Sequence, residues 1–167
     1  MTATFILGGA RSGKSARAQA LAEAAGEPRV YIATAEALDE EMEARIARHK
    51  ADRGAGWCTV EAPLDLVHAL EGAEAPVVLV DCLTLWLSNL MHHWRDVEAE
   101  TNELCACLGR FQGEVLLVSN EVGLGLVPET PLGRAFRDAQ GRLNQRVAAT
   151  CDVVEFVAAG LPLRLKG

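Results

Sequence analysis

Short apolar runs alternate with longer segments of helical periodicity along the chain. The runs are rich in β-branched residues and apolar at nearly every position, which is typical of strands buried on both faces of a parallel sheet. They cover Thr4–Leu7, Val30–Ala33, Val77–Val80, Val115–Val118 and Val153–Val157. Because the intervening segments are long enough for helices, the pattern predicts an α/β fold with a mostly parallel sheet and helices on both faces.

The segments between these runs contain helix-forming residues and helix-stop signals. Ala16–Ala25 is rich in helix formers and is followed by Gly26 and Pro28. Further helices are predicted over Leu38–Lys50, over Asp96–Leu108, and along an apolar stripe of Leu132, Phe136, Ala139, Leu143 and Val147. After Phe156 the chain can turn at Gly160 into one more edge strand. Loops are predicted at Arg53–Gly56 and Val122–Pro131.

Length and composition narrow the class of protein. A chain of 167 residues, 50% of them hydrophobic, predicts a single domain over residues 1–167 that folds without metals or disulfides. The net charge of -7 argues against general binding to nucleic acid or to anionic membranes. No apolar run is long enough to cross a membrane, and the first residues lack the charged start of a signal peptide. We therefore expect a cytoplasmic protein with no membrane insertion, whose five cysteines are buried or inert thiols.

A phosphate-binding motif lies directly between the first predicted strand and the first predicted helix. Gly8-Gly9-Ala10-Arg11-Ser12-Gly13-Lys14-Ser15 satisfies the pattern G-x-x-x-x-G-K-[ST]. Glycines let consecutive backbone N–H groups turn toward phosphate oxygens, and the helix amino terminus adds a favourable potential. Lys14 would reach the terminal phosphates, and the Ser15 hydroxyl would complete a Mg²⁺ shell. A nucleoside triphosphate, GTP or ATP, is the predicted ligand.

An acidic residue ends the third apolar run. Asp81 follows Val77–Val80, at the carboxyl end of a predicted strand, where α/β proteins bind their ligands. Its carboxylate could orient Mg²⁺ or the waters around the ion, although a solvated acid at the start of a loop remains an alternative. Ser15 and Asp81 are thus the candidate metal-site residues.

The sequence argues against a GTPase switch. Such proteins commonly read guanine with an N-K-x-D motif, and the positions of Lys14, Lys50 and Lys166 exclude it. Residues 138–141 match D-x-x-G, but they fall within a helical pattern and do not follow a strand. We interpret that match as coincidental.

Taken together, the motifs resemble the bifunctional adenosylcobinamide kinase and adenosylcobinamide-phosphate guanylyltransferase family of cobalamin assembly. The resemblance covers nearly the whole chain. Besides the phosphate loop it rests on Tyr31-Ile-Ala-Thr34, Arg45-Ile-Ala-Arg-His-Lys50 with Arg53, Trp57 and Glu61, Ser119-Asn-Glu-Val-Gly-Leu-Gly-Leu-Val-Pro128, and Phe136-Arg-Asp138 with Gly141, Asn144 and Gln145. Two departures from the pattern are a short Leu90–Glu100 segment and Arg48 where a second histidine can occur.

The resemblance implies a RecA-like P-loop NTPase that works as a homotrimer and catalyses two reactions. Adenosylcobinamide is first phosphorylated on its aminopropanol hydroxyl, and GMP is then transferred from GTP onto that phosphate with release of pyrophosphate. In the second reaction GMP is carried on the histidine of an R-I-x-x-H motif, which is His49 here. The resemblance also assigns nucleotide-binding positions, namely Ala33, Thr34, Ala35, Lys50, Ala51, Asp52, Arg53, Glu61 and Asp81.

His49 is also a chemically reasonable nucleophile. The neutral imidazole, whose reference pKa is about 6.5, offers a lone pair near pH 7 that can attack the α-phosphorus of GTP. A histidine on an apolar helix face is otherwise more often structural, and the motif decides between the two interpretations. Two alternatives stay open: a small-metabolite kinase without nucleotidyl transfer, and a nucleotide-dependent binding module. The phosphate donor, the kinase base, the corrinoid contacts and the number of nucleotide sites are also left open.

Overall fold

A computed structural model describes residues 2–36 and 40–167, apart from the side chains of Arg45, His49, Lys50 and Asp52. The strands are β1 (Thr2–Gly8), β2 (Arg29–Ala33), β3 (Trp57–Glu61), β4 (Val77–Asp81), β5 (Glu114–Asn120), β6 (Val153–Ala158) and β7 (Leu161–Lys166). The helices are α1 (Lys14–Ala25), α2 (Glu40–Asp52), α3 (Leu66–Glu71), α4 (Leu83–His92), α5 (Val97–Arg110) and α6 (Pro131–Thr150).

The strands form one seven-stranded sheet in the order β3-β2-β4-β5-β1-β6-β7. Every neighbouring pair is parallel except β6 and β7, which form an antiparallel hairpin at one edge. The register places Gly8 beside Asn120, and Asp81 and Glu61 on either side of Ala33. The carboxyl ends of the central strands therefore form one edge of the sheet, at which the phosphate loop begins.

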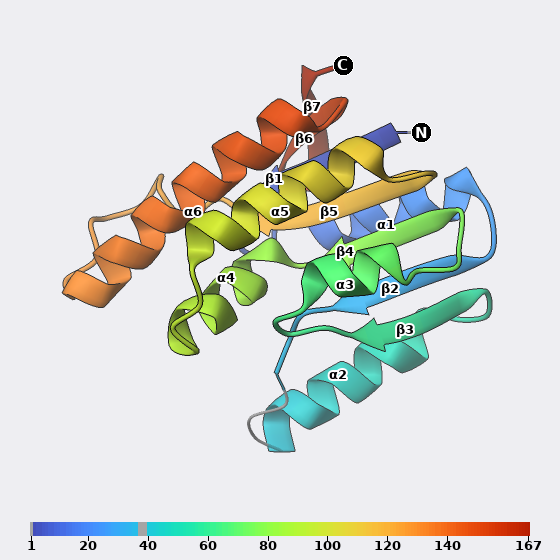
Figure 1. Cartoon of the computed structure of the whole chain (residues 1–167), viewed down its shortest axis with the longest axis horizontal. Helices are drawn as coiled ribbons and strands as arrows, with labels where there is room; N and C mark the ends of the chain where they lie inside the picture. Colours follow the sequence, from blue (N-terminus) through green and yellow to red (C-terminus); the bar gives the residue numbers. More distant parts are fainter. Residues whose placement is uncertain (1, 37–39) are drawn as a thin grey trace.

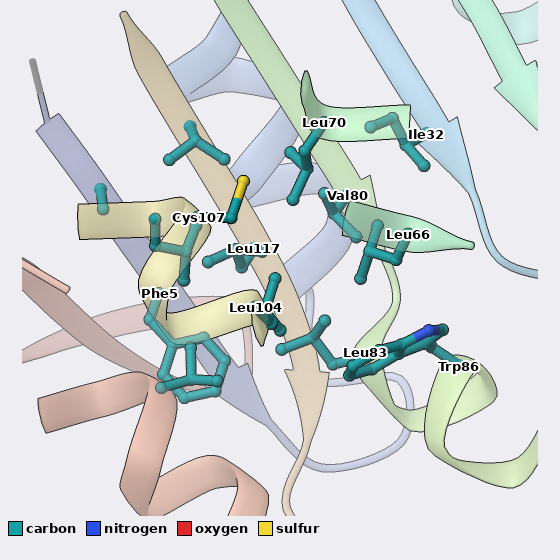
Figure 2. Close-up of a cluster of buried hydrophobic side chains, with 14 of the residues drawn as sticks. Phe5, Ile32, Leu66, Leu70, Val80, Leu83, Trp86, Leu104, Cys107 and Leu117 are labelled. Atoms are coloured by element: carbon teal, nitrogen blue, oxygen red, sulfur yellow. The ribbon is translucent and has the colours of Figure 1, made fainter. Parts of the chain in front are cut away.

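The larger part of the core lies on one face of the sheet, beneath α3, α4, α5 and α6 (Figure 1). Phe5, Leu117 and Val80 project from the strands toward Leu104 of α5 and Leu83 and Trp86 of α4, as Figure 2 shows. All of these side chains are buried. Trp86 keeps its indole nitrogen satisfied by donating to the carbonyl of Leu64 at 2.8 Å.

The opposite face is covered by α1. Ala18 and Ala22 lie fully buried against Ile6, Leu79 and Val118. Small residues let the backbone of this helix approach the sheet closely, which holds the phosphate loop against the strand ends. The predicted parallel sheet with helices on both faces is thus confirmed.

The strands predicted from the apolar runs are all present with slightly longer bounds, and the edge strand after Gly160 is β7. The helix predicted from Leu38 is described from Glu40, and its first residues lie outside the described part of the chain. The match to D-x-x-G at residues 138–141 falls inside α6. That position agrees with its interpretation as a coincidence.

Some expectations differ from the structure. Leu132 was predicted to lie in the apolar stripe of the last helix, but it is exposed because the first turn of α6 extends beyond the sheet (Figure 1). Three elements were not predicted: β3, α3 and α4. The helix predicted over Asp96–Leu108 is α5, which begins one residue later, at Val97, and ends two residues later, at Arg110.

Candidate nucleotide-binding site

The phosphate loop has a backbone shape that requires glycine at two positions. A Cβ at Gly8 would lie 2.4 Å from Ser12 Oγ and 2.6 Å from the carbonyl oxygen of Val157, so no larger residue fits. Gly13, which precedes α1, has a φ of 95° and approaches Gly160 closely. The loop is therefore tightly packed against the end of β6 and leads directly into the first turn of α1.

The remaining loop residues complete a cradle for phosphate. Lys14 Nζ donates to the carbonyl of Gly9 at 3.1 Å, which curls its side chain over the loop. Ser15 is exposed on the first turn of α1, and Ala10 and Arg11 are exposed at the tip. The amide of Gly160 donates to the carbonyl of Ser12 at 2.8 Å, so the β6–β7 turn supports the loop from behind.

A second group of predicted residues lines a cavity beneath α2. The cavity measures about 180 Å³, and its walls consist of Tyr31, Ala33, Ala35, Met42, Ile46, Arg53, Asp81 and Leu85. Four of them, Ala33, Ala35, Arg53 and Asp81, come from the predicted nucleotide-binding set. The structure thus brings residues from three separate segments together at the carboxyl edge of the sheet.

Arg53 and Tyr31 form the polar wall of this cavity. The guanidinium carbon of Arg53 lies 3.4 Å from the centre of the Tyr31 ring, and the Tyr31 hydroxyl donates to Asp81 Oδ2 at 3.1 Å. Arg53 is 7% exposed, and among the described residues its Nε and Nη1 have no hydrogen-bond partner. Because a buried N–H without a hydrogen-bond partner is costly, these N–H groups are suited to donate to an anionic ligand.

Burial and the neighbouring Asp81 charge raise the pKa of the Tyr31 phenol above its ordinary value. The phenol therefore stays protonated and keeps donating to Asp81 through the neutral range. Sequence reasoning did not assign Tyr31 to the site. The signal was its position two residues before Ala33, since residues i and i+2 of a strand share a face.

Thr34 holds the site together from inside the protein. Its side chain is fully buried, and its hydroxyl donates to the carbonyl of Cys82 at 2.7 Å and accepts from the Cys82 amide at 2.9 Å. Asn89 Nδ2 donates to the Thr34 carbonyl at 2.7 Å. The hydroxyl of Thr34 thus joins the end of β2 to the end of β4, where Asp81 lies.

The remaining predicted residues lie on α2 and β3. Ala51 is exposed near the end of α2, and Glu61 is exposed at the end of β3. Positions 49, 50 and 52 belong to the same helix, but the side chains of His49, Lys50 and Asp52 lie outside the described part of the structure.

The donor set at the edge of the sheet fits Mg²⁺. Ser15 offers a hydroxyl oxygen and Asp81 a carboxylate oxygen, and Mg²⁺ typically uses one or two such protein ligands with substrate phosphates and waters. Among the side chains that the structure describes, which exclude those of His49 and Asp52, no three His, Cys, Asp or Glu gather as a metal-binding cluster. No helix in the described part of the chain is both long and apolar enough to span a membrane.

Fold and phosphate loop define a P-loop nucleotide-binding protein of the RecA-like class. The flagellar accessory protein FlaH from Methanocaldococcus jannaschii superposes with a TM-score of 0.61 at 14% identity, over 99% of this chain and 78% of that one. The RadB recombinase gives a TM-score of 0.55 at 13% identity, over 93% of this chain and 73% of that one. At such identities these similarities concern the fold alone.

Comparison with proteins of similar sequence identifies the family. A family model described as cobinamide kinase / cobinamide phosphate guanyltransferase matches residues 4–165. The bifunctional adenosylcobalamin biosynthesis protein CobP of Pseudomonas aeruginosa is 49% identical, over 98% of this chain and 96% of that protein. The CobU protein of Salmonella typhimurium is 41% identical, over 97% and 98%. The chain belongs to this family, and it is an enzyme with cobinamide kinase and guanylyltransferase activity.

Proposed function

We propose that this enzyme phosphorylates adenosylcobinamide at the phosphate loop and then transfers GMP from GTP to the product through a covalent intermediate on His49. The observation that carries the proposal is the cavity under α2. There Arg53 is buried, with Nε and Nη1 lacking a partner among the described residues, and it lies with Asp81 at the same edge of the sheet as the phosphate loop. A triphosphate held by that loop would extend along this edge.

In the first reaction the substrate hydroxyl oxygen attacks the terminal phosphorus. A new P–O bond forms, the bond to the bridging oxygen breaks, the nucleoside diphosphate leaves, and the hydroxyl proton is lost. Lys14 and the loop amides stabilise the charge on the phosphoryl oxygens. The Ser15 hydroxyl and the Asp81 carboxylate would hold Mg²⁺, which neutralises charge on the bridging and terminal phosphates when bound.

In the second reaction a His49 nitrogen attacks the α-phosphorus of GTP, and the bond to pyrophosphate breaks. An oxygen of the corrinoid phosphate then attacks the same phosphorus, the P–N bond breaks, and the imidazole is regenerated. Met42 and Ile46 line the cavity, and position 49 follows Ile46 by three residues. Helical periodicity therefore assigns position 49 to the same face of α2.

Arg53 is suited to bind the transferring phosphoryl group. Its planar guanidinium is fixed on the Tyr31 ring, so it presents N–H donors in one orientation and loses little freedom when an anion binds. Its charge would offset the negative charge that develops on the α-phosphate oxygens. We also propose the homotrimer that the family resemblance implies, which sedimentation of the purified protein tests.

Labelling with GTP that carries a radioactive α-phosphate tests the intermediate. We expect an acid-labile label on the wild-type chain and on His68→Ala, a control at an exposed histidine of α3, but none on His49→Ala. The His49→Ala protein should keep most of its kinase activity. Absence of label on an active wild-type enzyme would exclude the covalent route.

The phosphate loop is tested by a separate variant. Lys14→Ala should lower both reactions by about 100-fold or more, because each uses the same triphosphate cradle. Kinase and transferase rates are measured on the same preparation, with circular dichroism as the check on folding. Loss of only one activity would mean that the two reactions use different nucleotide sites.

A further inference from the structure

The segment between β5 and α6 exposes a group of apolar side chains. We call residues 121–130 the leucine loop. Leu124 is 83% exposed, Leu126 is 97% exposed and Val127 is 64% exposed. Figure 1 shows this segment extending beyond the carboxyl end of β5, and the pairing of Gly8 with Asn120 places the phosphate loop at the same end of the sheet. Grouped apolar side chains in water are unfavourable unless something covers them in the working protein.

Hydrogen bonds hold the leucine loop in this shape. The Glu121 carboxylate accepts from the Gly123 amide at 2.8 Å and from the Leu124 amide at 3.0 Å. At the other end, Arg134 Nη1 donates to the carbonyls of Pro128 and Glu129 at 3.0 and 2.9 Å. The outward position of the leucines is therefore a built feature of the fold.

The leucine loop is joined directly to the phosphate cradle. The amide of Glu121 donates to the carbonyl of Gly8 at 3.0 Å. A cavity of about 310 Å³ lies between them, lined by Gly9, Glu121, Val122, Leu124, Gly125 and Phe156. It is a different cavity from the one beneath α2, since the two share no lining residue. An acceptor bound here would meet a triphosphate at the Gly9 end of the loop.

We propose that the leucine loop is the docking surface for the corrin macrocycle of the acceptor, and that the adjoining cavity takes its hydroxyl-bearing arm. This inference rests on the proposed function. A cavity of about 310 Å³ is at the small end for ligand pockets and cannot enclose a macrocycle, so the ring must lie on the surface beside it. The surface next to Gly9 is the leucine loop, whose apolar side chains can pack against the ring methyl groups while the ring amides stay in water.

The test is equilibrium dialysis of cobinamide against the full chain, followed by the corrinoid's absorbance. Leu126→Ser should raise the dissociation constant for cobinamide about tenfold, which corresponds to ~1.4 kcal/mol. Leu165→Ser is the matched control, because Leu165 is an exposed leucine of β7 at the opposite end of the sheet. That variant should change the constant less than twofold. Leu124→Ser provides a second variant in the leucine loop.

Two results would overturn the inference. One is an unchanged dissociation constant for both leucine-loop variants. The other is a smaller sedimentation coefficient for Leu126→Ser with unchanged cobinamide affinity, because the leucines would then be covered by a second copy of the chain. Cobinamide binding is measured without nucleotide and without turnover. Its result therefore does not depend on whether the proposed reactions occur. Weakened binding in an enzyme that forms no phosphorylated product supports the docking surface and contradicts the proposed reactions.

Discussion

At the scale of single residues, Arg53 combines burial, charge and fixed orientation. Its guanidinium lies over the Tyr31 ring, and two of its N–H groups lack partners among the described residues. A lysine would retain the charge but lose the planar stacking and the fork of donors. The position therefore needs arginine specifically.

We expect Arg53→Lys to lower the rate of GMP transfer by about 10-fold to 100-fold, in line with the loss of an oriented charge at the transferring group. The matched control is Arg48→Lys, at an exposed arginine of α2, which should keep the wild-type rate within about twofold. Single-turnover assays with GTP measure the transfer step. Equal losses in the two variants would show that the effect is not specific to position 53 and would remove the specific role of Arg53.

The single tyrosine of the chain allows a direct check on the cavity wall. Burial and the Asp81 charge raise the Tyr31 pKa above its ordinary value of about 10. Stability from this shift is fully present below the unfolded pKa of about 10 and is lost as the pH rises above it. Ultraviolet difference titration should show no phenolate at pH 11 in the native protein, whereas in denaturant the same residue should ionise near pH 10. Native ionisation near pH 10 would contradict the buried hydrogen bond to Asp81.

At the scale of elements, one ion pair joins α1 to β6. Arg17 Nε and Nη2 donate to the two carboxylate oxygens of Glu155 at 2.8 and 2.9 Å, and the Glu155 side chain is 3% exposed. Arg164 of β7 adds a longer contact to the same carboxylate. These bonds hold the pKa of Glu155 below its usual range, chiefly through Arg17. The pair ties the phosphate-loop helix to the strand behind it.

Replacing Glu155 with Gln should lower the free energy of unfolding at pH 7 by about 1–3 kcal/mol, because the amide removes the buried charge and one of the two oxygens that accept from Arg17. Because the folded pKa is lowered, this stability is present above the unfolded value of about 4.3 and is lost as the pH falls through the folded value. The difference between wild type and variant should therefore shrink below about pH 4. Urea unfolding at both pH values measures it. Glu71→Gln, which breaks the exposed pair with Arg110, is the control and should cost less than about 1 kcal/mol.

Elements that are buried on both faces or strongly periodic could be predicted from the sequence, and those that depend on tertiary context could not. β1 and β4 appear as uninterrupted apolar runs because both faces are covered. β3 is a sheet edge with only partial burial, so its residues lack that pattern. α3 has six residues, and only Cys82 lies between β4 and α4, so no loop segment marks the start of α4.

The same distinction applies to the site. The phosphate loop has a fixed spacing within a few residues, so its position and shape could be predicted. The cavity wall needs Tyr31, Arg53 and Asp81 from three segments, and their contact depends on the sheet order. Thr34 was predicted to help bind the nucleotide, and that prediction did not include the hydrogen bonds of its hydroxyl to the Cys82 backbone, which form because β2 and β4 are neighbours.

At the scale of the whole molecule, buried cysteines lie in the apolar clusters on both faces of the sheet, so their reactivity can be used to follow the unfolding of each face. Cys107 and Cys151 belong to the core cluster under α5 and α6, whereas Cys82 belongs to the cluster under α1. Burial raises the pKa of all three thiols, that of Cys151 to about 12. Cys58 is exposed and Cys105 is partly exposed. The native protein should therefore react with a thiol reagent at Cys58 and Cys105, and at the other three only after unfolding.

The same thiols test the proposal that residues 1–167 form one domain. Because the clusters on the two faces share the central strands, loss of either layer exposes apolar surface on the other side of the same sheet. Cys82, Cys107 and Cys151 should become reactive together, with one midpoint in urea, as followed by mass spectrometry of the labelled peptides. Cys58 serves as the internal control, since its labelling should be nearly independent of urea. If Cys82 became reactive at a clearly lower urea concentration than Cys107 and Cys151, the α1 layer would unfold as a separate unit.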